Sequence, residues 1–240
     1  MRKHIYLAVI LTLIFSSCST EKEEPTAQTQ YPVGSVFGPS GPTKVVDVTN
    51  PKTGKTWMDR NLGATRAAIS STDIESYGDL YQWGRRADGH QIRNSITTST
   101  LSSTDVPGNA NFILLPNYSP YDWRSPQNSN LWQGVNGVNN PCPSGYRLPT
   151  ETEWNAERLS WTSQNNAAGA FASPLKLPLA GRRSDIQGIN GSLYGVGGSG
   201  YYWCSTVSST DSRVLAFGSI SADMGTSYRA DGMSIRCIKN

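Results

Sequence analysis

Histidine is the side chain best suited to proton transfer near neutral pH, and this chain contains two, His4 and His90. His4 lies in an N-terminal leader that export would remove, so the mature chain keeps only His90. A zinc site with several histidines is therefore excluded, and any Ser-His-Asp or Cys-His arrangement must use His90. The surrounding residues, ADGHQIRN, are typical of a turn and predict a solvated loop histidine rather than a catalytic one.

Paired carboxylates are the other route to acid–base chemistry, since glycoside hydrolysis needs two of them across a cleft. The candidate carboxylates are Asp59, Asp79, Asp88, Asp185 and Asp231. Their spacing singles out no pair. Glu151 and Glu153 are better explained by helix capping and the helix dipole. The glycine-rich stretch 195–200 precedes a predicted strand instead of joining a strand to a helix, so it is not a phosphate-binding loop.

A long irregular segment carries the positive case for binding, because its aromatic rings alternate with amides and charged groups. The candidate ligand-binding residues are Tyr121, Asp122, Trp123, Arg124, Asn128 and Trp132. Flat rings suit sugar faces or protein hot spots, and polar neighbours can orient a ligand. The alternative is that the rings fill a small satellite core, which we favour for Trp123 and Trp132. The other large aromatic candidates for the main core are Trp57, Trp83, Trp154 and Trp203.

The elements that must position these residues are short. Runs at 43–49 and 55–62 predict a β-hairpin around the turn NPKTG. Thr150 and Glu153 form a capping-box pattern, which predicts a helix that begins after Thr150 and turns Trp154 and Leu159 inward. Three further candidate strands, at 200–206, 213–220 and 233–239, predict an antiparallel meander. The chain therefore reads as α+β with an unusual share of loop.

The N-terminus has a basic start, an apolar run from Ile5 to Phe15, and small residues directly before Cys18. The run is too short to span a bilayer, which is typical of an export signal. We expect a lipoprotein signal peptide over residues 1–17 with Cys18 lipidated; an ordinary signal peptide with an incidental cysteine is the alternative. The polar, proline-rich residues 18–42 predict a disordered tether, and residues 43–240 a single domain.

The net charge gives little information about function, because loss of the signal peptide would leave 19 basic and 18 acidic residues, a net charge of about +1. The chain has no run of Lys or Arg, so it lacks the electrostatic footprint of a nucleic-acid-binding protein. With Cys18 lipidated, three cysteines remain and three disulfide pairings are open. We favour Cys142–Cys237, since both lie beside strongly patterned segments, whereas Cys204 lies inside an aromatic strand.

Six motifs in this order resemble the Fibrobacter succinogenes major paralogous domain family over nearly all of residues 43–240. They are WMDRNLGAT, GDLYQWGR, CPSGYRLPTETEW, LPLAGRR, GYYWCST and GMSIRCIK. The phrase RLPTETEW is shared with the formylglycine-generating enzyme fold, a variant of the C-type lectin fold. The resemblance implies a C-type lectin-like domain with a small twisted antiparallel sheet, few helices and long ordered loops. The acidic residues 21–24 also resemble the signal that sends Bacteroidetes lipoproteins to the outer face of the outer membrane.

The resemblance also bears on the cysteines and on cofactors. Family members usually carry serine where this chain has Cys204, so the family disulfide would use Cys142 and Cys237. Formylglycine-generating relatives bind copper through a close cysteine pair, but the nearest cysteine to Cys237 is 33 residues away. We therefore expect no cofactor. Calcium, which lectin-type folds often bind through loop oxygens, is the one alternative, and its ligands are unassigned.

Together these observations predict a non-catalytic, surface-exposed lipoprotein with a lectin-like domain that binds an extracellular glycan or protein. We expect it in the outer membrane, lipid-anchored and facing the exterior. The first alternative is a structural or accessory subunit of a surface fibre or envelope assembly. A weaker alternative is a glycan-active enzyme. Assembly predicts exposed apolar surface or a free edge strand, glycan binding predicts a groove with an exposed Trp, and hydrolysis predicts facing carboxylates.

Overall fold

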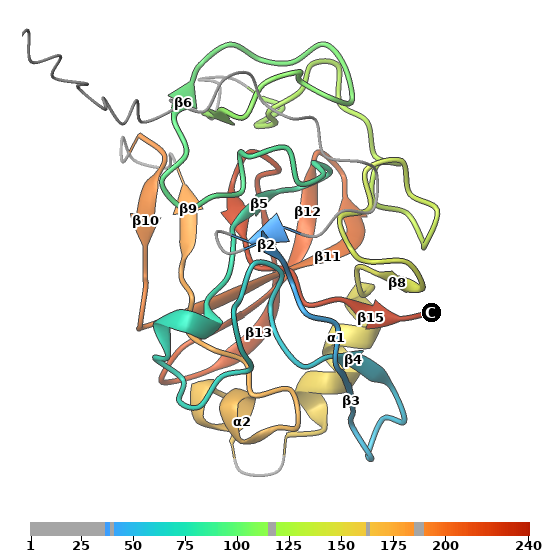
Figure 1. Cartoon of the computed structure of the whole chain (residues 1–240), viewed down its shortest axis with the longest axis vertical. Coiled ribbons are helices and arrows are strands. Elements are labelled where there is room, and N and C mark those ends of the chain that lie inside the picture. Colours follow the sequence, from blue (N-terminus) through green and yellow to red (C-terminus); the bar gives the residue numbers. More distant parts are fainter. Residues whose placement is uncertain (1–36, 39–40, 115–118, 162–163, 185–189) are drawn as a thin grey trace, which may run out of the picture.

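The computed structural model describes residues 37–38, 41–114, 119–161, 164–184 and 190–240 (Figure 1). The predicted signal peptide, the Cys18 lipidation site and most of the predicted tether lie outside the described residues. Within the last residues of that tether, β1 (Phe37–Gly38) pairs antiparallel with β2 (Gly41–Pro42). In the described part of the chain, no helix is long and apolar enough to cross a membrane.

The described secondary structure consists of short strands in five small sheets, two α-helices and one 3-10 helix. The helices are α1 (Glu151–Leu159), α2 (Ala167–Ala172) and η1 (Ile74–Ser76). All strand pairs are antiparallel except that of β6 (Thr97–Thr98) with β7 (Phe112–Ile113). The structure confirms the predicted α+β class, with few helices and small antiparallel sheets.

Two four-stranded sheets bring together strands that lie far apart in the sequence. One has the order β3 (Asp47–Thr49), β4 (Thr56–Met58), β15 (Ile238–Lys239), β8 (Tyr146–Arg147). The other has the order β10 (Ser192–Tyr194), β9 (Arg182–Ser184), β14 (Gly232–Met233), β5 (Tyr81–Gln82). The pairing of β3 with β4 across NPKTG confirms the predicted hairpin.

The antiparallel meander is present, but the sequence pattern misplaced its third strand. The sheet order is β11 (Gly200–Ser208), β12 (Asp211–Phe217) and β13 (Ala222–Ser227). The predicted third strand, 233–239, instead contributes to β14 and β15 in the two four-stranded sheets. Residues 233–239 are rich in apolar side chains and run through the buried centre, so their pattern resembles that of a strand. The edge strand β13 reads ADMGTS and lacks an apolar run.

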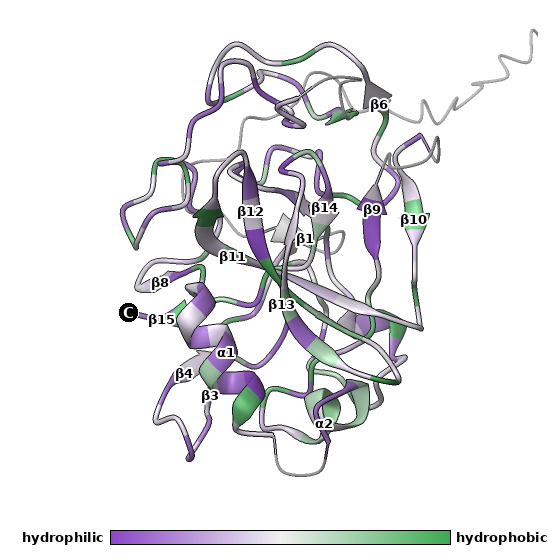
Figure 2. Ribbon diagram, turned by 180° about the vertical axis from the view of Figure 1, so that it is seen from behind, coloured by the Kyte–Doolittle hydropathy of each residue, from purple (hydrophilic) through white to green (hydrophobic). Residues whose placement is uncertain are grey.

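The three-stranded sheet separates two hydrophobic clusters. Tyr201 and Trp203 pack with the first cluster, and Tyr202 and Cys204 belong to the second, because successive residues of a strand face opposite sides. Helix α1 packs against this sheet on the second side (Figure 2). The four tryptophans assigned to the core, Trp57, Trp83, Trp154 and Trp203, are all buried as predicted.

Helix α1 begins where the sequence predicts. The Thr150 hydroxyl accepts from the Glu153 N–H, and the Glu153 carboxylate accepts from the Thr150 N–H, which completes the capping box. Arg147 adds two hydrogen bonds to the same carboxylate, of 2.7 and 2.8 Å. Trp154 is buried, but Leu159 is 68% exposed, which corrects its predicted inward orientation. Five residues on from Trp154, Leu159 points about 140° around the helix from it.

The hydrogen bonds to the Glu153 carboxylate predict that folding stability decreases when this group is protonated in acid. Partial burial raises its pKa, but the hydrogen bonds from Arg147 and Thr150 outweigh burial and bring the pKa down to about 2. The stabilisation is therefore complete above pH 4.5, the ordinary pKa, and is lost as the pH falls toward 2. We expect Glu153→Gln to lower the free energy of unfolding at pH 7 by about 1–2 kcal/mol, measured by urea denaturation.

Glu151→Gln is the matched control, because Glu151 lies in the same helical turn and pairs with Arg213 near the surface. We expect this control to lose less stability than Glu153→Gln and to keep the acid transition between pH 4.5 and 2. Equal stability losses in the two variants would contradict the capping role of Glu153.

The disulfide joins Cys142 to Cys237, as predicted, and Cys204 is a free, buried thiol. The bond connects the turn before β8 to the residue before β15, and it closes a loop with a sequence separation of 95. In the chain-entropy model a loop of this length contributes about 4–5 kcal/mol. We expect a Cys142→Ala, Cys237→Ala double variant to lose stability of that order in urea denaturation. Cys204→Ala, which removes a buried thiol but no crosslink, should lose far less; similar losses would contradict the prediction.

Candidate functional site

The aromatic residues of the predicted binding segment are largely enclosed. Trp123 is 1% exposed and Trp132 is 0% exposed. Their indole N–H groups donate to the carbonyl oxygens of Trp83 and Asn139, at 2.7 and 2.9 Å. Neither ring face is open to a ligand, which agrees with the packing interpretation that the sequence favoured for both residues.

The polar members of the same set mainly hold the segment to its neighbours. Arg124 forms an ion pair with Asp105 at 2.8 Å, and Asn128 donates to Asp105 at 3.0 Å. Asp122 is buried opposite Arg229, 3.9 Å from its guanidinium. Burial raises the pKa of Asp122 to about 6 against the effect of Arg229.

Tyr121, the remaining member of the set, is half-buried and packs on Tyr228, with ring centroids 4.4 Å apart. The structure therefore brings these predicted residues into one loop but not onto one open face.

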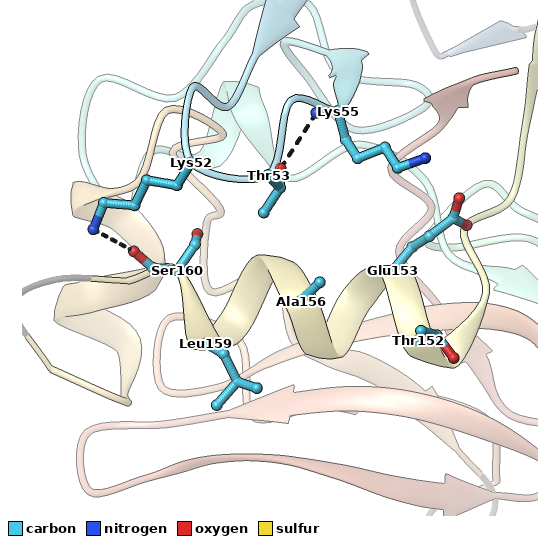
Figure 3. Close-up of a pocket in the computed structure, with 8 residues that line it drawn as sticks. All are labelled: Lys52, Thr53, Lys55, Thr152, Glu153, Ala156, Leu159 and Ser160. Carbon is cyan, nitrogen blue, oxygen red and sulfur yellow. Dashed lines mark hydrogen bonds between the residues drawn. The ribbon is translucent and has the colours of Figure 1, made fainter.

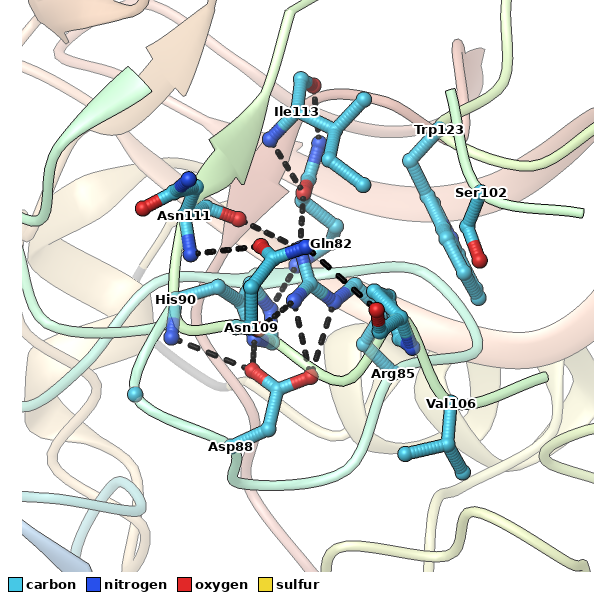
Figure 4. A network of polar contacts seen from close by, with 12 residues as sticks. Gln82, Arg85, Asp88, His90, Ser102, Val106, Asn109, Asn111, Ile113 and Trp123 are labelled. Atoms are coloured by element: carbon cyan, nitrogen blue, oxygen red, sulfur yellow. Dashed lines mark hydrogen bonds and ion pairs between the residues drawn. The ribbon is translucent and has the colours of Figure 1, made fainter. Parts of the chain in front are cut away.

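A buried polar network at the base of this loop contains the histidine (Figure 4). Arg85 donates to the Asp88 carboxylate at 2.7 Å and to the Gln82 side-chain oxygen at 2.8 Å. It also donates to the carbonyl oxygens of Asn109 and Asn111. The guanidinium of Arg85 thereby connects β5 to the chain just before β7.

His90 belongs to this network and is fully buried, so the predicted solvated loop histidine is wrong. Its Nε2 accepts from the Gln82 N–H at 3.0 Å, which places the ring proton on Nδ1, 2.6 Å from the Asp88 carboxylate. Both ring nitrogens are occupied and neither faces solvent. His90 is therefore a structural residue in this geometry. The turn-like sequence around it gave no indication that it would be buried.

The remaining carboxylates have separate environments. Asp59 is held by Arg60, and Asp231 accepts from Ser184 and Ser227; Asp185 lies outside the described residues. Asp79 is buried, and its Oδ2 lacks a hydrogen-bond partner among the described residues. Burial raises the pKa of Asp79 to about 8, against the effect of Arg93, so this carboxyl is mostly protonated at pH 7.

Gly63 forms part of the environment of Asp79. It has φ +81°, and a Cβ at Gly63 would lie 2.4 Å from the Asp79 Cγ, so only glycine fits there. Among the residues that the structure describes, no three His, Cys, Asp or Glu side chains are grouped so as to hold a metal ion. The calcium expectation stays a prediction.

A group of exposed apolar side chains lies around β10. We define the β10 surface as Ile69, Ile74, Leu193, Tyr194 and Val196, whose side chains are all exposed. The Leu179 N–H donates to the Ser71 carbonyl oxygen, and the Leu179 carbonyl oxygen accepts from the Gly197 N–H, so the backbone around η1 lies beside the turn after β10. Strand β10 and the teal helix η1 lie on the same side of the molecule (Figure 1).

The side chain of Arg182 packs against the aromatic ring of the β10 surface. Its guanidinium carbon lies 5.6 Å from the Tyr194 ring centroid and 5.1 Å from that of Tyr201, a cation–π arrangement that holds the two rings in place. Sequence reasoning missed this surface because it considered only the glycine-rich stretch 195–200 before a predicted strand and assigned nothing to residues 191–194. The signal that could have identified it is Leu-Tyr-Gly-Val between glycines, where apolar residues have little chain to bury them.

Comparison of the chain with protein-family models, with curated proteins and with solved structures found no match. The interpretation of the site therefore rests on its geometry. That geometry shows a sealed loop interior and an open apolar edge.

The buried histidine predicts a specific pH response. Burial, followed by the charge of Arg85, lowers the pKa of His90 from its ordinary 6.5 to about 4, against the opposing effect of Asp88. Between these values the unfolded chain binds the additional proton, so stability is full above pH 6.5 and falls as the pH drops toward 4. The loss approaches about 3 kcal/mol.

The histidine can be measured directly by nitrogen-detected NMR. We expect an Nδ1–H tautomer that does not titrate between pH 5 and 8, with the signal assigned by its absence in His90→Gln. A midpoint near pH 6.5, as in a solvated histidine, would contradict the assigned network.

Proposed function

We propose that this chain is a non-catalytic binding domain of an exported lipoprotein, and that it holds an extracellular protein partner on the β10 surface. The observation that carries the proposal is the open edge of β10, flanked by exposed apolar side chains. No other described strand pairs with the outer side of β10. An edge with unpaired backbone groups is a template for another chain.

Natural edge strands usually have features that prevent pairing with another chain, such as a charge, a proline or a very short length. Of these three features, β10 has only the short length. Its residues Ser192, Leu193 and Tyr194 include no charge and no proline, although the strand is short. All three residues are exposed. Arg182 fixes the ring of Tyr194, so little side-chain entropy is lost when a partner packs on it.

A protein partner fits this surface better than a glycan does. Six of the seven tryptophans are buried, and Trp161 is half-buried against Phe217. The β10 surface is instead mostly aliphatic, with one tyrosine whose ring is already contacted by Arg182. Tyr and Arg are enriched at protein interfaces, and an open edge strand can pair with a strand of a partner.

The remaining elements of the proposal concern family and location. The motif order, the start of α1 within RLPTETEW and the Cys142–Cys237 bond support membership of the Fibrobacter succinogenes major paralogous domain family with a C-type lectin-like architecture. The N-terminal sequence supports lipidation at Cys18 and display on the outer face of the outer membrane. A tether of this kind would let the domain reach a partner beside the membrane.

The second candidate is an accessory subunit of a surface fibre or envelope assembly, which the same open edge favours. In that case the partner is another component of the assembly rather than an external protein. A glycan-active enzyme is the weakest candidate, because Asp59 and Asp88 are held in ion pairs by Arg60 and Arg85.

The experiment places a photo-crosslinking amino acid at position 193 or 196 of the full chain, displayed on its own cells. We expect each to give the same discrete protein adduct, identified by mass spectrometry, and we expect Ile74→Asp to weaken it. The control position is Val138, which is 59% exposed but lies in the loop before β8, on the opposite side from β10 (Figure 1). Equal crosslinking from Val138, or none from 193 and 196, would contradict the proposal. Glycan-array binding that Tyr194→Ala abolishes would replace it with a lectin function.

A further inference from the structure

A groove lies between the β3–β4 turn and the outer face of α1 (Figure 3). Its volume is about 560 Å³, within the range of ligand sites. The lining residues are Lys52, Thr53, Lys55, Thr152, Glu153, Ala156, Leu159 and Ser160. The groove is remote from β10 in the fold, and it takes no part in the function proposed above.

The two walls of this groove are fixed by contacts beneath it. Asn50, which is buried, donates to the Glu157 carboxylate at 2.6 Å and to the Ser160 hydroxyl at 2.8 Å. Lys52 donates from Nζ to the Ser160 carbonyl oxygen at 2.8 Å, which anchors the turn to the end of α1. The groove is therefore preformed, and a ligand would bind without paying to order it.

The floor of the groove explains the exposed leucine. Thr152, Ala156, Leu159 and Ser160 are spaced as one solvent-facing side of the helix. Ala156 and Ser160 point toward the hairpin, whereas Thr152 and Leu159 point away from it (Figure 3). Ala156 and the strongly exposed Leu159 form an apolar strip between polar ends. An apolar strip at the last turn of a helix contributes nothing to the core, so it is available to a ligand.

The charge available to a ligand is positive. Glu153 is committed to Arg147 and to the helix cap, and Glu157 to Asn50. The Lys55 ammonium has no hydrogen-bond or ion-pair partner among the described residues, and Lys52 has one neutral acceptor. The lining thus has two lysines and one carboxylate, that of Glu153, and this net positive charge favours an anionic ligand.

We propose that this groove binds an extended acidic peptide segment, with its carboxylates at Lys52 and Lys55 and an apolar side chain on Ala156 and Leu159. The helix face from Thr152 to Ser160 is about 12 Å long at 1.5 Å per residue. An extended peptide rises about 3.3 Å per residue, so about four residues span it. Alternate residues of an extended peptide face opposite sides, so two carboxylates separated by one apolar residue can face the lysine wall while the apolar side chain faces the helix.

The test uses fluorescence anisotropy with the full chain and a fluorescein-labelled Gly-Glu-Leu-Glu-Gly peptide. We expect saturable binding that 0.5 M salt weakens and that a Gly-Lys-Leu-Lys-Gly peptide does not reproduce. Lys55→Glu and Leu159→Asp should each weaken binding by about tenfold, equivalent to about 1.4 kcal/mol. Lys44→Glu is the matched control, since Lys44 is also exposed but lies at the far end of the hairpin from the turn, and it should bind as the parent does.

Amide chemical shifts provide a second readout on the unmodified protein, with the largest changes expected at Ala156 and Leu159. No saturable binding, binding unaffected by Lys55→Glu, or equal binding of the lysine peptide would each overturn the proposal. Saturable binding of octanoate without binding of the peptide would also overturn it, in favour of a small amphipathic anion. None of these outcomes bears on β10, because the crosslinking positions lie outside the groove.

Discussion

The buried guanidinium of Arg85 is the group on which the loop-rich half of this molecule depends. A buried cation is stable only when it is paired and fully hydrogen-bonded, and Asp88, Gln82 and two backbone carbonyl groups meet that requirement here. Those acceptors come from segments that regular secondary structure does not hold together. The loops must therefore remain where Arg85 can reach them, and His90 completes the arrangement by occupying the second oxygen of Asp88.

The same requirement explains the aromatic residues. Long ordered loops bury polar backbone groups without a strand ladder to satisfy them, so side chains must supply the partners. Trp83, Trp123 and Trp132 each donate an indole N–H to a carbonyl oxygen while their rings fill the interior. A segment rich in Trp, Tyr and Asn can thus have the composition of a binding site and serve chiefly as the packing of a loop.

Sealing of the loop interior leaves the periphery as the place for recognition. The β10 edge presents apolar side chains held by Arg182, and the groove beside α1 presents an apolar strip with two lysines. Both surfaces are held by buried or cross-strand contacts, which keeps them preformed. They differ in chemistry, one mostly aliphatic and one cationic, so the two proposed ligands need not compete.

The sequence by itself determined the local features: the β3–β4 hairpin, the helix start at Thr150, and the burial of Trp57 and Trp154. Each follows from turn chemistry, a three-residue capping pattern or strong hydrophobicity, which act over a few residues. Only the tertiary structure decided the burial of His90, the exposure of Leu159, the place of β13 and the open edge of β10. Those outcomes depend on which distant segment packs against each residue, and a polar histidine or an apolar leucine carries no record of its neighbour in the local sequence.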